Sequence, residues 1–146
     1  MRTGRLLAGC CLFFLSACAT QEPVATLGYL EQIADEESRS VLRVVTNDVS
    51  MDGRYAHIRG TVENIGSERV EGIRYVVLFL SDDTPPRLLD TYRKQADTTL
   101  APGERKALAL DVDSTHNDRL GFNPATILAT PVKLGGNDVP APPQWK

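Results

Sequence analysis

Residues 73–80 read Ile-Arg-Tyr-Val-Val-Leu-Phe-Leu, and this run decides the fold class. Apart from Arg74, both alternating sets of side chains are apolar, which is typical of a strand covered on its two faces or of the densest part of a sandwich core. Pro85 and Pro86 end the run, because a proline nitrogen cannot donate a ladder hydrogen bond. We expect both faces to be core. The alternative is that one face stays exposed as an apolar stripe that accepts a partner or an acyl chain.

Shorter strand patterns flank this run, with turn residues between them. The expected strands are residues 41–46, 55–63, 87–94, 106–112 and 126–134. Turns are expected at Asp52-Gly53 and residues 64–67, and Pro102-Gly103 has the residue order of a type II turn. Pro131 places the last strand at an edge or a bend. Six or seven short strands with no long helix between them predict an all-β fold, an antiparallel β-sandwich of Ig-like size.

Three short motifs lie within these strands and turns. Residues 58–64 read Ile-Arg-Gly-Thr-Val-Glu-Asn, residues 76–82 read Val-Val-Leu-Phe-Leu-Ser-Asp, and residues 100–104 read Leu-Ala-Pro-Gly-Glu. Together they resemble the FxLyD family of small bacterial Ig-like domains, with Ser81 at the tyrosine position of the family name. This resemblance implies a β-sandwich of secreted proteins and lipoproteins, and it supplies no catalytic residues.

The N-terminal segment has the features of an export signal. Arg2 and Arg5 precede an apolar run that ends at Leu15, about half the length that a membrane-spanning helix requires. The following Leu-Ser-Ala-Cys quartet, residues 15–18, resembles the lipobox of bacterial lipoproteins. That resemblance implies a diacylglyceryl group on the Cys18 sulfur, cleavage between Ala17 and Cys18, and a fatty acyl group such as palmitate on the new N-terminus. The alternative is an ordinary secretory signal.

These features divide the chain into four parts. Residues 1–17 are the expected signal peptide, and residues 18–39 form a lipidated tether with a short helix expected over residues 27–39. Residues 40–136 are the expected sandwich. Residues 137–146 form a proline-rich tail, expected to be extended. Trp145 in this tail indicates either a docking peptide or a frayed end.

Charge and cysteine content exclude several classes of function. The chain carries 16 basic and 19 acidic residues, and removal of Arg2 and Arg5 leaves 14 against 19, a net charge of −5. The charges are interspersed, so nucleic acid is not an expected partner. Without residues 1–17, Cys18 is the single cysteine, and its lipid would be the only cofactor. The mature chain then has no disulfide, cysteine-ligated metal or cysteine nucleophile.

The acidic segment 111–118 is the densest cluster of possible metal ligands. Asp111, Asp113 and Asp118 offer the hard oxygens that calcium prefers, although no glycine provides the sharp turn of a calcium loop. The alternative is a solvated loop. His57 and His116 are the only histidines, and no Gly-x-Ser-x-Gly elbow accompanies them, so a hydrolase is the least favoured class.

We therefore expect a non-enzymatic lipoprotein of the cell envelope. Its Ig-like domain would face the periplasm and bind an envelope protein, and Ala19 after the lipidated cysteine favours the outer membrane by resemblance to the sorting signals of enteric bacteria. The alternative is a periplasmic lipoprotein that binds a small ligand or a metal ion.

Overall fold

The computed structural model describes residues 23–53, 55–81, 83–84, 86–113 and 123–145. The elements are α1 (Pro23–Arg39), β1 (Leu42–Asp52), β2 (Tyr55–Asn64), β3 (Val70–Leu80), β4 (Leu88–Leu100), β5 (Arg105–Asp113), β6 (Asn123–Leu134), β7 (Asn137–Asp138) and the 3₁₀ helix η2 (Pro143–Trp145). Within these residues, no helix has the length and apolar character needed to cross a bilayer.

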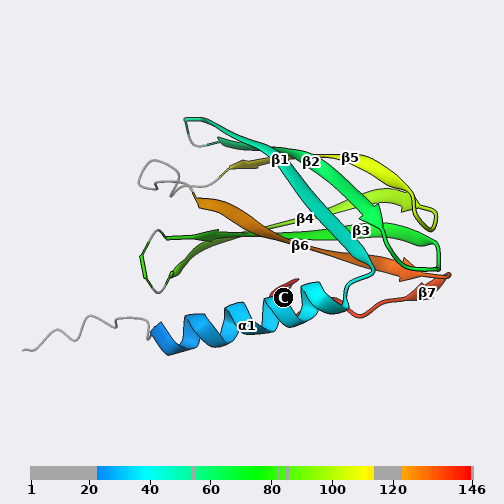
Figure 1. Cartoon of the computed structure of the whole chain (residues 1–146), viewed down its shortest axis with the longest axis horizontal. Helices are drawn as coiled ribbons and strands as arrows, with labels where there is room; N and C mark the ends of the chain where they lie inside the picture. Colours follow the sequence, from blue (N-terminus) through cyan, green and yellow to red (C-terminus); the bar gives the residue numbers. More distant parts are fainter. Residues whose placement is uncertain (1–22, 54, 82, 85, 114–122, 146) are drawn as a thin grey trace, which may run out of the picture.

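Two antiparallel sheets face each other. One has the strand order β1-β2-β5 and the other β4-β3-β6-β7 (Figure 1). The prediction of an all-β sandwich of six to seven strands is confirmed. β3, which contains the run at residues 73–80, lies between β4 and β6, so it is a central strand as its composition predicted.

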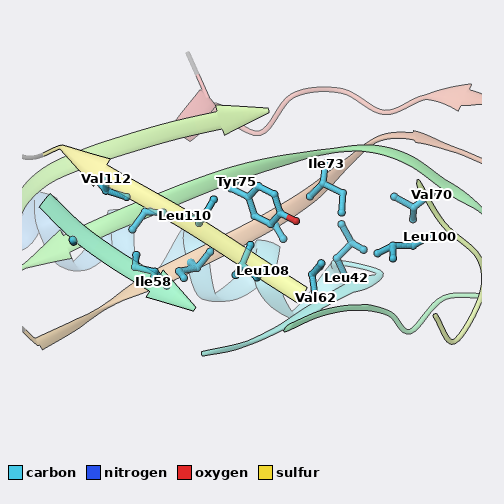
Figure 2. Close-up of a cluster of buried hydrophobic side chains, with 14 of the residues drawn as sticks. Leu42, Ile58, Val62, Val70, Ile73, Tyr75, Leu100, Leu108, Leu110 and Val112 are labelled. Atoms are coloured by element: carbon cyan, nitrogen blue, oxygen red, sulfur yellow. The ribbon is translucent and has the colours of Figure 1, made fainter. Parts of the chain in front are cut away.

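The main core lies between the two sheets. β2 and β5 direct Ile58, Leu108 and Leu110 inward, and these meet Ile73 and Tyr75 of β3 (Figure 2). Tyr75 is only 3% exposed, and this burial raises the pKa of its phenol to about 12. One alternating set of β3 side chains therefore supplies the centre of the sandwich.

The other face of β3 is also covered. Val76 and Leu78 form a second buried cluster with Ile33 of α1 and Leu128 of β6, and Trp145 packs against it. α1 runs along the outer side of the four-stranded sheet (Figure 1). The prediction that both faces of this strand are core is confirmed.

The helix and the tail differ from the sequence prediction. α1 begins at Pro23, four residues before the expected start at Leu27, because proline is favoured in the first turn of a helix, where its missing N–H leaves no hydrogen bond unmade. The tail turns into η2 after Pro142 and packs Trp145 onto the sheet instead of remaining extended. Pro142 is itself buried.

The close approach of β1 to β2 explains why residue 60, within the motif at residues 58–64, is a glycine. β1 carries a bulge between Thr46 and Asp48, and there the Val45 carbonyl oxygen comes so close to Gly60 that a Cβ atom would overlap it. A residue without a side chain is needed where two backbones approach this closely.

Candidate functional site

Asn64 is the centre of a buried polar cluster at one end of the sandwich. Its side chain is fully buried, and Nδ2 donates to the carbonyl oxygens of Glu68 at 2.8 Å and Leu100 at 3.2 Å. Its Oδ1 accepts the Gly66 N–H at 3.0 Å. Three hydrogen bonds satisfy this buried amide, as a buried polar group requires.

The backbone of Asn64 joins the same cluster to the turn at residues 101–104. The Asn64 N–H donates to the Glu104 carbonyl at 3.0 Å, and the Gly103 N–H donates to the Asn64 carbonyl at 2.9 Å. Gly103 has a φ of 74°, and the Glu104 N–H donates to the Ala101 carbonyl, as in the predicted type II turn. The Ala101 N–H donates to the Glu104 carboxylate at 2.7 Å and lowers the pKa of that group. The motifs at residues 58–64 and 100–104, which are far apart in sequence, are therefore linked by hydrogen bonds in the folded chain.

The outer face of the three-stranded sheet, called the open face below, is covered by no described element. At one end of this open face, Glu63 lies between two arginines, with its oxygens 3.2 Å from Arg43 and 3.1 Å from Arg105. The middle of the face carries Val45, which is 48% exposed, and the exposed Ala107. The open face thus consists of ordered cross-strand pairs around a small, weakly polar centre.

Asp111 lies at the other end of the open face, and two neighbours bind it. His57 Nδ1 and Arg59 Nη2 are both 2.8 Å from Asp111 Oδ1. The His57 hydrogen bond, followed by that of Arg59, lowers the pKa of this carboxyl. The Asp111 carboxylate therefore remains an anion at neutral pH, bound by His57 and Arg59 of β2.

The predicted metal ligands are placed only in part. Asp111 and Asp113 lie on the same face of β5, whereas Asp118 is outside the described residues. Among the residues that the structure describes, no group of three or more His, Cys, Asp or Glu side chains could hold a metal ion. The calcium site therefore stays a prediction, with Asp111 already engaged by His57 and Arg59.

The predicted lipidation site, Cys18, and the cleavage position at Ala17 also lie outside the described residues. α1 begins at Pro23, five residues after Cys18. The predicted anchor is therefore close in sequence to the helix that covers the four-stranded sheet.

An apolar groove of about 540 Å³, which no sequence motif indicated, lies beside the end of α1. Val41, Leu134 and Val139 line it together with prolines of the tail. Thr130 contributes a buried hydroxyl that has no hydrogen-bond partner among the described residues. The groove arises where the helix, β6 and the tail meet, so no local sequence pattern marks it.

Comparison with known proteins supports the fold. No protein-family model and no curated relative matches the chain. The Salmonella enterica trimeric lipoprotein SadB has a similar fold, with a TM-score of 0.50 and 13% identity over 80% of this chain and 71% of that chain. At this identity, the similarity shows the fold alone.

Weaker structural matches occur in larger enzymes. A β-glucosidase from Listeria innocua gives a TM-score of 0.33 and 14% identity over 62% of this chain, and the match spans 16% of the enzyme. A β-glucuronidase from Bacteroides uniformis gives a TM-score of 0.30 and 23% identity over 60% of this chain, and the match spans 8% of the enzyme. Both matches concern a small part of each enzyme and carry no argument about activity.

Proposed function

We propose that this chain is a bacterial lipoprotein anchored in the outer membrane through Cys18. Its FxLyD-like sandwich would face the periplasm and act as a non-enzymatic binding module. The lipobox-like residues 15–18 support the anchor. The fold that this chain shares with a Salmonella lipoprotein agrees with a lipoprotein. An envelope protein is the proposed partner.

The observation that carries the proposal is the difference between the two outer faces of the sandwich. α1 and Trp145 cover the centre of the four-stranded sheet at Val76 and Leu78, whereas none of the elements that the structure describes covers the open face of the three-stranded sheet. The five residues from Cys18 to Pro23 reach at most about 17 Å when fully extended. A lipid on Cys18 therefore keeps the start of α1 near the bilayer, and the open face lies on the opposite side of the sandwich from this helix.

The open face suits a protein partner better than a reaction. Its charged side chains largely pair with one another, as Glu63 does with Arg43 and Arg105, and as Asp111 does with His57 and Arg59. Such pairs give orientation and partner choice more than affinity. Its exposed apolar side chains, Val45 and Tyr55, would supply the buried contact area.

Two measurements test the anchor. Mass spectrometry of the mature chain should give an N-terminal Cys18 that carries diacylglyceryl and N-acyl groups. Cys18→Ser should move the protein from the membrane fraction to the soluble fraction, whereas Ser16→Ala, a small-residue change beside the cleavage position, should leave it in the membrane. An unmodified Cys18, or an unchanged distribution of Cys18→Ser, would refute the anchor.

A photo-crosslinking amino acid tests the binding face. Placed at Ser50 or Ala107 on the open face, it should capture the same envelope protein, and placed at Asp97 on β4 it should not. Capture of that protein from Asp97 alone would contradict the proposed face. No specific capture from either face would contradict the binding module.

The groove beside α1 favours a second candidate, the binding of a small apolar ligand. Its volume of about 540 Å³ lies within the range of ligand pockets, and its lining is mostly apolar. Ala141→Trp would fill this groove, and Ala107→Trp on the open face is the matched control. This candidate predicts that uptake of an apolar fluorescent dye falls in the first variant and not in the second.

A further inference from the structure

β5 has an unpaired and regular strand edge. On one side it pairs with β2 through nine consecutive residue pairs without a register shift, from Glu63↔Arg105 to Tyr55↔Asp113. On its other side, no strand pairs with it among the described residues. Its central residues, 107–110, read Ala-Leu-Ala-Leu and carry no charge. A row of free N–H and C=O groups on such an edge is a template for another strand.

The other three edges of the sandwich are obstructed. β1 is bulged between Thr46 and Asp48, and β4 carries Arg93 and Lys94 side by side. β6 contains Pro131, and β7 covers its end. Bulges, charged residues and prolines are the usual devices that prevent edge pairing. β5 alone among these edges has an uncharged and uninterrupted centre.

The charges of β5 select both the partner and the direction of pairing. Arg105 lies at its beginning, whereas Asp111 and Asp113 lie at its end on the same face. If two copies pair antiparallel about Ala109, Arg105 of each copy lies opposite Asp113 of the other, and Leu108 lies opposite Leu110. Parallel pairing would place like charges together instead. Opposite charges directly across a strand pair stabilise it, and like charges destabilise it.

We propose that β5 of one chain pairs antiparallel with β5 of a second copy, with Ala109 on the twofold axis. The two three-stranded sheets then form one six-stranded sheet across the dimer. Because Ala109 pairs with its own equivalent, the axis is perpendicular to the sheet, and α1 of both copies lies on the same side. This arrangement goes beyond the binding module proposed above, and it allows two Cys18 anchors to enter one bilayer.

The interface is small, so its strength in solution is limited. Pairing of one strand from each copy buries less than the roughly 1,200 Å² at which standard interfaces begin. For so small an interface we expect a dissociation constant on the order of micromolar to millimolar. Confinement of two anchored copies on a bilayer would raise their effective concentration.

Disulfide trapping tests the register. In a full chain with Cys10, Cys11 and Cys18 all changed to Ser, an introduced cysteine is the only thiol. Ala109→Cys should form an intermolecular disulfide on oxidation, because directly opposed Cα atoms lie about 4.5–5.5 Å apart. Ala107→Cys lies on the same face but about 13 Å from its equivalent, so it should not. Equal trapping of both variants, or of neither, would overturn the proposed pairing.

Charge exchange tests the partner. Sedimentation of the chain without cysteines, up to about 1 mM, should show a concentration-dependent dimer. Arg105→Asp and Asp113→Arg should each be monomeric, and a mixture of the two should recover the dimer. A chain that remains monomeric throughout, or a mixture that recovers nothing while both variants keep the melting temperature of the parent, would overturn the proposal. These variants carry no lipid, so this result does not depend on the Cys18 anchor.

Discussion

Asn64 gives the sharpest test of how the two sequence motifs hold the sandwich together. Asn64→Ala removes the donors to the Glu68 and Leu100 carbonyls and the acceptor for the Gly66 N–H. Each net hydrogen bond contributes about 1 kcal/mol, and a buried group left without a partner costs more. We expect the free energy of unfolding to fall by about 3 kcal/mol and the melting temperature by about 10 °C.

Asn64→Asp separates the hydrogen bonds from the shape of the side chain. A carboxylate keeps the acceptor for Gly66 N–H but faces the Glu68 and Leu100 carbonyl oxygens, which repel it. Repulsion and burial raise the pKa of this aspartate in the folded state above the value of about 3.9 in the unfolded chain. The folded state then holds the proton to higher pH, so stability relative to the wild type falls as pH rises above about 4.

Urea unfolding at several pH values measures both effects. The loss in Asn64→Ala should be constant between pH 4 and 7, whereas the loss in Asn64→Asp should grow over the same range. Ser67→Ala, at an exposed position of the same connection, is a control that should change the free energy of unfolding by less than about 0.5 kcal/mol. A loss below about 1 kcal/mol in Asn64→Ala, or the same pH profile for both variants, would refute this account.

Three further substitutions test the packing. Gly60→Ala should destabilise the fold by about 1–3 kcal/mol, because its Cβ atom overlaps the Val45 carbonyl oxygen, and an unchanged urea midpoint would contradict this close approach. Thr130→Val should raise stability by about 1 kcal/mol in the same assay, since a methyl group replaces a buried hydroxyl that has no partner in the described part of the chain; a loss of stability would show that the hydroxyl is bonded. Tyr75 has a folded-state pKa of about 12 against 10 in the unfolded chain, so stability should fall as pH rises from 10 to 12, by at most about 2.7 kcal/mol. Tyr75→Phe should lack this fall, and an equal fall in the variant would assign it to other groups.

The strands were largely predictable because their patterns are local. The apolar run at residues 73–80 and the alternation at residues 55–63 correspond to β3 and β2, and the type II turn at Pro102-Gly103 is confirmed. The strand ends were less accurate. β4 extends to Leu100, six residues beyond its expected end at Lys94, because hydrogen bonds to β3 extend a segment whose own propensity for strand is weak.

The polar sites were less predictable than the strands. Asp111 was chosen for its metal-binding chemistry, but its neighbours His57 and Arg59 are more than 50 residues away in sequence and reach it only through the β2–β5 register. Asn64 belongs to a motif that the sequence shows, yet its hydrogen bond to the Leu100 carbonyl forms only because the end of β2 meets the end of β4. Both contacts follow from pairing between distant segments, which local periodicity does not encode.

The sequence by itself determined the alternation of β-strands and the apolar composition of β3 on both faces, because each depends on residues that are neighbours in the chain, whereas the export signal at residues 1–17 stays a prediction. The tertiary structure alone decided which faces are covered. Only the packing of α1 and Trp145 onto Val76 and Leu78 shows that the outer face of one sheet is covered at its centre, whereas among the described residues the other sheet presents the open face and β5 pairs with a strand on one side only. Burial is a property of surfaces brought together from distant parts of the chain, so it is settled only when those parts meet.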